Sequence, residues 1–220
     1  GRGCVAETGV VARSPIAPAA PELILAGWAV SAHRSGAALT VTAFTPLTQV
    51  AIKAAPVGAT AERLEVPFGR VSRQIWTLGD RDSSVMVVGS GPGEWLVLGP
   101  PGSQVSLIHQ LSALAGDGDL VAVVDLSHGR ALVRLTGSWA AEVLAKETAM
   151  DLGDSVCPDG AAFRSAVAGL AADVIRDDRD GTRSYLVGCE RSSGQYLFDS
   201  LLESGAEFGI EVDGFVPPDI

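Results

Sequence analysis

The chain has 220 residues, and 47% of them are hydrophobic, which is enough apolar material for the core of one or two domains. Its 16 Lys and Arg residues against 26 Asp and Glu residues give a net charge of −10. A chain so short of cations is a poor partner for nucleic acids and anionic membranes, because both require a positive surface. No apolar run approaches the roughly 18–20 uncharged residues that a membrane-spanning helix requires.

The cysteines indicate a reducing compartment. Cys4, Cys157 and Cys189 are odd in number and lack CxxC spacing, so neither a disulfide framework nor a thiolate zinc site is predicted. Residues 1–37 contain no basic head followed by a continuous apolar segment, which argues against a secretory signal. We therefore expect a cytoplasmic protein.

The N-terminal region is rich in Ala, Gly and Pro, and its closely spaced prolines favour irregular backbone. We predict that residues 1–37 form a loosely attached, irregular arm, although the apolar stretch 23–30 has the composition to dock on another surface. A strand is predicted over residues 39–47, and an irregular linker then runs from Pro46 to Pro56.

Short strands are predicted for the next part of the chain, at residues 63–66, 71–78, 83–88 and 94–98. The loop before the last of them carries Gly89, Gly91 and Gly93, which suggests a dinucleotide-binding loop. That fingerprint requires glycine at its sixth position and a helix directly afterwards. Glu94 occupies the sixth position and a strand follows, so we interpret the loop as a hairpin turn.

A regular stretch from residue 93 to residue 152 alternates predicted strands and helices. Its first helix carries an apolar stripe of Val105, Ile108, Leu111 and Leu114, widened by Leu107. The run LVAVVDL (120–126) is typical of a central strand with both faces covered. Residues 130–136 return as an alternating strand, and a second helix follows over residues 139–146. The residues of that helix expected to face the sheet are Trp139, Val143 and Leu144.

Ser127 and His128 lie beside Asp125, which suggests a nucleophile triad. Adjacent strand residues point to opposite faces, so Ser127 and His128 would not easily share a site. No G-x-S-x-G elbow accompanies them. We interpret this stretch as a strand connection.

The C-terminal part is predicted to hold strands at residues 161–168, 170–176 and 182–190. Ser192 and Gln195 match a capping box, which predicts the start of a helix. The buried stripe expected on that helix is Tyr196, Leu197, Leu201 and Leu202. The whole order of elements indicates an α+β fold of split βαβ units, with antiparallel sheet and helices.

Four segments carry a family resemblance: GPGEWLVLGPPG (91–102), VVDLSHGRALVRLTG (123–137), AAEVLAKETAMDL (140–152) and SSGQYLFDSLLESGAEFG (192–209). In this order and spacing, the chain resembles the gamma subunit of heterotetrameric sarcosine oxidase over about residues 39–212. We accordingly divide the chain into an Ala/Pro/Gly-rich arm (1–37), a gamma-like α+β domain (38–212) and a C-terminal tail (213–220).

The resemblance implies a fold like the folate-binding domain of aminomethyltransferases. It also implies alpha, beta and delta partner subunits that carry FAD, FMN, NAD, zinc and the tetrahydrofolate site. In such a complex sarcosine is oxidatively demethylated to glycine with hydrogen peroxide, and the one-carbon unit passes to tetrahydrofolate. The gamma chain would be an accessory subunit with no cofactor of its own.

The residues themselves agree with an accessory role. They contain no metal-spaced His/Cys set, no complete phosphate loop and no acids that spacing forces together, so no catalytic, cofactor-binding or metal-binding residue is predicted. Two alternatives stay open. One is a stand-alone folate-binding or aminomethyltransferase-like protein, and the other is a gamma-like subunit of a related N-methyl amine oxidase or dehydrogenase.

An obligate subunit interface should be apolar at its centre, with aromatic and Arg anchors. The candidate interface residues are Trp95, Arg130, Arg134 and Trp139. For the two arginines, salt bridges to acids of the same chain are an equally good explanation. For each tryptophan, a place in the core is the alternative.

Overall fold

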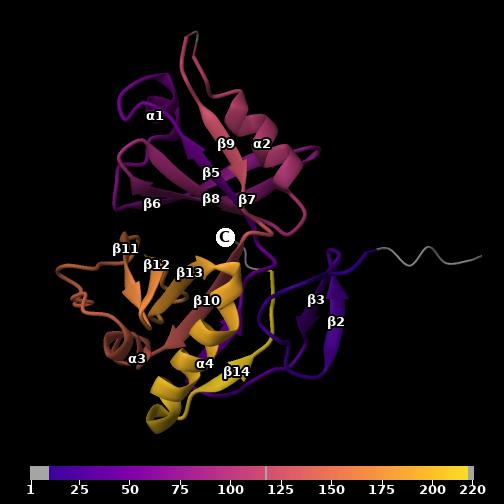
Figure 1. The fold of residues 1–220 in the computed structure, drawn as a ribbon, viewed down its shortest axis with the longest axis vertical. Helices are drawn as coiled ribbons and strands as arrows, with labels where there is room; N and C mark the ends of the chain where they lie inside the picture. Colours follow the sequence, from indigo (N-terminus) through magenta and orange to yellow (C-terminus); the bar gives the residue numbers. More distant parts are fainter. Residues whose placement is uncertain (1–9, 117, 218–220) are drawn as a thin grey trace, which may run out of the picture.

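A computed structural model describes residues 10–116 and 118–217. Three β-sheets and four α-helices make up this part of the chain (Figure 1). The two larger sheets lie one above the other in Figure 1, and the small sheet lies beside the lower one. Predictions for residues 1–9, which include Cys4, and for residues 218–220 fall outside the described residues.

The largest sheet has six strands in the order β11-β12-β13-β10-β4-β14. Their bounds are β4 Leu39–Ala43, β10 Arg130–Gly137, β11 Ala162–Val167, β12 Leu170–Arg176, β13 Ser184–Glu190 and β14 Glu211–Asp213. Neighbouring strands are antiparallel, except that β14 pairs parallel to β4. The alternation predicted for β10 is confirmed, because Ala131, Val133 and Leu135 are all buried on one face.

Helices α3 (Ala140–Glu147) and α4 (Gly194–Gly205) cover that face of the six-stranded sheet. Their fully buried side chains include Val143, Leu144, Leu197 and Leu201. Burying a side chain of this size contributes about 1.5–3 kcal/mol, so the apolar stripes fix how each helix lies on the sheet. Short 3-10 turns, Arg191–Ser193 and Ala206–Phe208, flank α4.

The second sheet has five antiparallel strands in the order β6-β7-β8-β5-β9. Their bounds are β5 Thr48–Lys53, β6 Val71–Leu78, β7 Arg81–Gly91, β8 Glu94–Gly99 and β9 Ala122–Asp125. Helices α1 (Ala59–Leu64) and α2 (Gln104–Ser112) cover its outer face through Leu64, Leu107 and Leu111. The hairpin predicted at Gly89–Gly93 is confirmed as the β7–β8 connection.

The inner faces of the two larger sheets pack against each other. Met86 and Leu98 of the five-stranded sheet share one buried cluster with Leu132 and Leu186 of the six-stranded sheet. The central strands of both sheets, such as β8 and β10, therefore have a covered face on each side, one against helices and one against the other sheet. The expected α+β fold is confirmed.

The third sheet is formed by the N-terminal region, in the order β1-β3-β2, with bounds β1 Ala12–Arg13, β2 Glu22–Leu25 and β3 Trp28–Ser31. Trp28 and Val30 are buried in the cluster between the sheets, and Ile16 is buried against the helices of the six-stranded sheet. The prediction of an irregular, loosely attached arm was wrong for this stretch. Its prolines lie between short strands instead of preventing them.

Two further predictions failed between residues 46 and 66. The expected linker contains β5, because Val50 and Ile52 alternate inward and are fully buried. The expected strand at 63–66 is the end of α1, whose sequence ATAERL is rich in helix-forming residues. That helix ends where Glu65 adopts the left-handed conformation, with φ 56°.

The run at residues 120–126 is not a central strand. It contains the shorter strand β9, which pairs with β5 on one side and lies at the edge of its sheet. Leu120 is 93% exposed and Val124 is 49% exposed. A continuous apolar run predicts coverage on both faces, but the order of strands decides which strand is at the edge.

Three helix details also differ from expectation. Trp139 is 47% exposed instead of facing the sheet, although Val143 and Leu144 face it as predicted. On α2 and α4, Val105 and Tyr196 are exposed, so the buried stripes are narrower.

The predicted capping box is absent, because Ser193 is the N-cap residue of α4 and makes no side-chain cap bond. Gln195 instead accepts a hydrogen bond from the Ala17 amide at 2.8 Å, which ties α4 to the N-terminal region.

Candidate functional site

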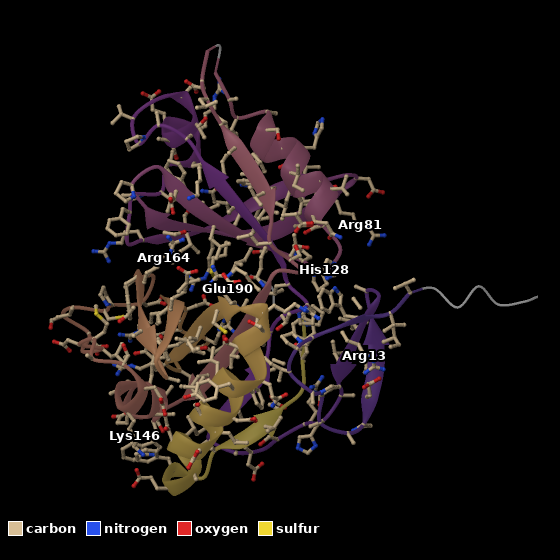
Figure 2. All side chains as sticks on the ribbon, viewed as in Figure 1. Arg13, Arg81, His128, Lys146, Arg164 and Glu190 are labelled. Atoms are coloured by element: carbon tan, nitrogen blue, oxygen red, sulfur yellow. The ribbon has the colours of Figure 1, made fainter. Side chains whose placement is uncertain are left out.

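A polar hollow lies at the rim of the inter-sheet packing. It consists of two adjoining cavities of about 280 and 610 Å³ that share Arg130, Arg164 and Asp173 in their walls. Val124 and Leu126, from β9 and the turn after it, form an apolar wall of the smaller cavity. Figure 2 shows Arg164 at the boundary between the two larger sheets.

A chain of ion pairs crosses this hollow from one sheet to the other. Lys53 Nζ lies 2.7 Å from Glu94 Oε1, and Glu94 Oε2 lies 3.1 Å from Arg164 Nη1. Arg164 Nε and Arg130 Nη2 each lie 2.6 Å from one oxygen of Asp173. The five charged groups alternate in sign, so each acid has a cation on both sides.

The electrostatics of this chain of ion pairs do not favour acid–base catalysis at neutral pH. The hydrogen bond from Lys53 lowers the pKa of Glu94, and Arg164 adds to that effect against the opposing effect of burial. A general base works best with a pKa near the operating pH, and this shift moves Glu94 away from it. The arrangement is suited to holding the two sheets in a fixed position relative to each other.

Arg130, one of the predicted interface residues, belongs to this chain of ion pairs. Its side chain is 16% exposed, and its Nε is buried without a hydrogen-bond partner among the described residues. The alternative considered from the sequence, a salt bridge to an acid of the same chain, is therefore confirmed for Arg130, whose partner is Asp173. Whether Arg130 also contacts a partner stays a prediction.

Arg134 lies deeper, in a second ionic cluster around Asp177. Its Nη2 is 2.6 Å from Asp177 Oδ2, its Nη1 donates to Ser184 Oγ at 2.8 Å, and its guanidinium stacks 4.7 Å over Phe44. Burial lowers the pKa of Arg134 to about 10, so it stays charged at neutral pH. With only 7% of its side chain exposed, Arg134 offers a partner little surface.

The two predicted interface tryptophans have opposite environments. Trp95 is 5% exposed, and its indole donates to the Val66 carbonyl at 2.7 Å, which makes it a core residue of the five-stranded sheet. Trp139 is half-exposed and stacks on Phe208, with ring centroids 5.1 Å apart. The Lys146 ammonium lies 4.7 Å from the Phe208 centroid. Only Trp139 of this pair presents an aromatic surface.

The contacts of Asp125, Ser127 and His128 do not form a nucleophile triad. The Ser127 hydroxyl is buried and accepts a hydrogen bond from the backbone amide of Gln49 at 3.1 Å. The Asp125 carboxylate accepts a hydrogen bond from the backbone amide of Ser127 at 2.9 Å. The His128 ring stacks on Trp28, with centroids 4.9 Å apart. These contacts explain the three residues as a strand connection.

Sequence reasoning missed the acids and cations that complete the inter-sheet chain of ion pairs, namely Lys53, Glu94, Arg164 and Asp173. One signal was available, because Arg164 and Asp173 lie directly opposite each other in the β11–β12 hairpin. Opposite charges at facing positions of a hairpin predict a cross-strand pair.

Within the described residues, no group of three or more His, Cys, Asp or Glu side chains is arranged to hold a metal ion. None of the described helices is long and apolar enough to cross a membrane.

The family model described as "Sarcosine oxidase, gamma subunit family" matches residues 64–207, which is more than half of the chain. The chain belongs to this family. The resemblance noted in the sequence is thereby confirmed. A search of curated proteins gave no match.

Solved structures show the same fold. The chain is similar to a chain of heterotetrameric sarcosine oxidase from Corynebacterium sp. U-96 in complex with pyrrole 2-carboxylate, with a TM-score of 0.66 and 22% identity over 80% of this chain and 88% of that one. It is also similar to glycine cleavage system aminomethyltransferase T from Bartonella henselae, with a TM-score of 0.68 and 14% identity. That match covers 88% of this chain and 55% of the aminomethyltransferase, so the gamma-family fold corresponds to about half of the larger enzyme.

Proposed function

We propose that this gamma-family chain is an accessory, non-catalytic subunit of a heterotetrameric sarcosine oxidase. The family match over residues 64–207 carries the proposal. The likeness of the whole fold to a chain of the Corynebacterium complex supports it, because nearly nine tenths of that chain is covered.

The geometry of the polar hollow also supports an accessory role. Its charged groups are engaged in a chain of ion pairs between the sheets, and the lowered pKa of Glu94 does not suit proton transfer at neutral pH. Groups held in this way stabilise a scaffold. Chemistry would then take place on the partner subunits.

We infer that those partners are alpha, beta and delta chains in the cytoplasm, and that FAD, FMN, NAD, zinc and tetrahydrofolate bind to them. The complex would oxidise the N-methyl group of sarcosine, releasing glycine and hydrogen peroxide, with transfer of the one-carbon unit to tetrahydrofolate. Residues 38–212 would form the gamma-like unit of this assembly, with residues 1–37 as its N-terminal arm and 213–220 as its tail.

Of the predicted interface residues, we favour Trp139 and Arg130 as partner contacts. Trp139 is exposed, and an aromatic side chain stacked on Phe208 is a rigid anchor of the kind that dominates interface energetics. Arg130 keeps 16% of its side chain exposed and lines both cavities of the hollow. Trp95 and Arg134 would support the interface from the interior.

Three measurements on the purified chain test the accessory role. The isolated chain should show no flavin absorbance and no turnover of sarcosine with tetrahydrofolate, and calorimetry with tetrahydrofolate should show no saturable binding. Saturable folate binding or folate-dependent turnover by the isolated chain would contradict the proposal and favour a stand-alone folate-binding protein.

The substrate is tested on the assembled complex. A sarcosine oxidase should release glycine and hydrogen peroxide from sarcosine at a higher kcat/KM than it oxidises other N-methyl amines. A clear preference for another N-methyl amine would assign the chain to a related oxidase or dehydrogenase instead.

A further inference from the structure

Strand β9 is an unprotected edge of the five-stranded sheet. It pairs with β5 along one side, and the order of strands leaves its other side without a neighbour in the described part of the chain. An unpaired strand edge is a template for another strand, and proteins usually block it with Lys, Pro or a bulge. The run LVAVVD (120–125) contains neither Lys nor Pro.

The register shows which backbone groups of β9 face outward. Leu126 donates its amide to the Gln49 carbonyl at 2.8 Å, and Val50 lies opposite Asp125. Bonded and non-bonded pairs alternate in an antiparallel ladder, so Val124 is bonded to β5 whereas Val123 and Asp125 are not. The backbone amides and carbonyls of Val123 and Asp125 therefore point outward from the free edge, on the side opposite β5.

Exposed apolar side chains accompany these backbone groups. Leu120, just before the strand, is 93% exposed, and Val124 within it is 49% exposed and lines the inter-sheet hollow. Val121 and Val123, on the other face, pack toward the helix-covered core. The free edge thus offers a hydrogen-bonding row with an apolar strip directly beside it.

The opposite edge of the same sheet is covered at its start. The amide of Val71 in β6 donates to the Gly160 carbonyl at 2.9 Å, and Arg73 of the same strand is paired with the buried carboxylate of Asp177. The connection before β11 therefore protects β6. No comparable cover is seen over β9 among the described residues.

The charges around β9 indicate what kind of strand fits. Asp119 and Asp125 flank the apolar strip, and each accepts a hydrogen bond from a backbone amide, of Gly116 and Ser127 respectively. In the described part of the chain neither carboxylate forms an ion pair. A second copy of this chain would bring the same two acids and another net charge of −10, so it does not complement this edge.

We propose that β9 is a docking edge for an extended segment of a partner subunit. The segment pairs with the outward amides and carbonyls of Val123 and Asp125 and covers Leu120 and Val124 with apolar side chains. Its Lys or Arg residues lie beside Asp119 and Asp125. This is strand addition, in which main-chain hydrogen bonds give affinity and alternate side chains give specificity. The inference rests on the proposed function, because it requires a partner subunit.

Two matched pairs of variants test this edge in the full chain, co-expressed with the alpha, beta and delta chains and recovered through an affinity tag. Val124→Lys places an ammonium on the apolar strip, and Ile75→Lys does the same at an exposed site of β6. Asp125→Asn removes a charge but keeps the acceptor for the Ser127 amide, and Asp80→Asn is its exposed control.

Val124→Lys should lower the amount of partner retained by about tenfold, and Asp125→Asn should lower it less, with both controls matching the unmodified chain. Circular dichroism checks that each variant is folded. Assembly that is equally strong with Val124→Lys and with Ile75→Lys would overturn the inference while leaving the proposed function intact. An unmodified chain that recovers no partner would overturn both.

Hydrogen exchange on the unmodified chain gives a test that needs no variant. The outward amides in residues 120–126 should exchange rapidly in the isolated chain and become protected in the assembled complex. Unchanged exchange of this segment on assembly would contradict strand addition at β9.

Discussion

Asp177 is a fully buried carboxylate that neutralises arginines from three parts of the chain. Arg134 and Arg179 lie 2.6 and 2.8 Å from its Oδ2, and Arg73 of β6 donates to its Oδ1. Because Arg73 belongs to the five-stranded sheet and Arg134 to the six-stranded sheet, this one residue ties the two sheets together. Removing its charge would leave the buried guanidinium of Arg134 uncompensated and would weaken the pairing of the partly exposed Arg73 and Arg179.

Asp177→Asn should therefore destabilise the protein by about 3–5 kcal/mol, the usual cost of breaking a buried ion pair by removing one partner. The free energy of unfolding in urea measures the effect. Asp80→Asn, at a side chain that is 94% exposed, is the control and should change it by less than about 0.5 kcal/mol. An equal, small change in both variants would show that the buried cluster contributes little.

The same residue predicts a pH dependence. Burial on its own would raise the pKa of Asp177, but the charges of Arg134 and Arg179 and the hydrogen bonds from Arg134 and Arg73 outweigh it, so the pKa is lowered. The unfolded chain then binds a proton at a higher pH than the folded chain does. The stability from this group is fully present above about pH 4 and is lost as the pH falls through the folded pKa.

Urea unfolding at a series of pH values should therefore show stability falling below about pH 4, and the Asp177→Asn variant should show a shallower fall. Glu94, whose pKa is lowered by Lys53, contributes in the same direction. Identical pH profiles for the variant and the unmodified chain would remove Asp177 as a source of the dependence.

At the scale of elements, the β7–β8 hairpin depends on close approach of its turn to a neighbouring segment. Gly93 has φ 70°, and a Cβ there would collide with the Ala54 carbonyl oxygen. Gly79, in the turn between β6 and β7, has the same φ but open space around it. An alanine at either position would therefore have the same backbone strain, but only Gly93→Ala would bring a Cβ into collision with a backbone carbonyl oxygen.

Gly79→Ala should cost about 1 kcal/mol from the left-handed backbone alone, and Gly93→Ala should cost about 1–3 kcal/mol more. Thermal unfolding of the two variants side by side measures the difference. Equal melting temperatures would mean that the segment around Ala54 moves aside freely.

The elements that the sequence predicted correctly are those set by local pattern. The β6 strand, the hairpin at Gly89–Gly93, helix α2 and strands β10 to β13 follow from alternation, turn residues and apolar spacing. The failures depend on contacts made elsewhere in the chain. The LVAVVDL run was predicted to be a central strand, because its own residues do not show which strands lie beside it in the sheet. Strand β5 was missed because it lies between two prolines.

The candidate site divides in the same way. The Arg164–Asp173 pair lies across a single hairpin and was available from local sequence. The Lys53–Glu94 pair requires knowing that β5 lies beside β8, and the Arg130–Asp173 pair requires the order of β10, β13 and β12. The chain of ion pairs connects two sheets, so it depends on which strands lie side by side and does not follow from local sequence.

For the whole molecule, the main change from the sequence-based view concerns the N-terminal region. Trp28 is 5% exposed and packs between the sheets against His128, so the described part of this region belongs to the fold. Truncating its side chain removes buried aromatic area that nothing else fills.

Trp28→Ala should cost about 3–5 kcal/mol of unfolding free energy. Trp139→Ala should cost about 1 kcal/mol in the isolated chain, mainly from its stacking on Phe208. Denaturant unfolding followed by circular dichroism compares the two. A negligible effect of Trp28→Ala would restore the view of a loosely attached arm.

The assembly state tests the central claim most directly. The tagged chain, co-expressed with the alpha, beta and delta chains, should be recovered as a complex whose native mass corresponds to one copy of each of the four subunits, with flavin absorbance contributed by the partners. A native mass equal to that of the isolated chain, obtained while the other three chains assemble without it, would contradict a role as the gamma subunit.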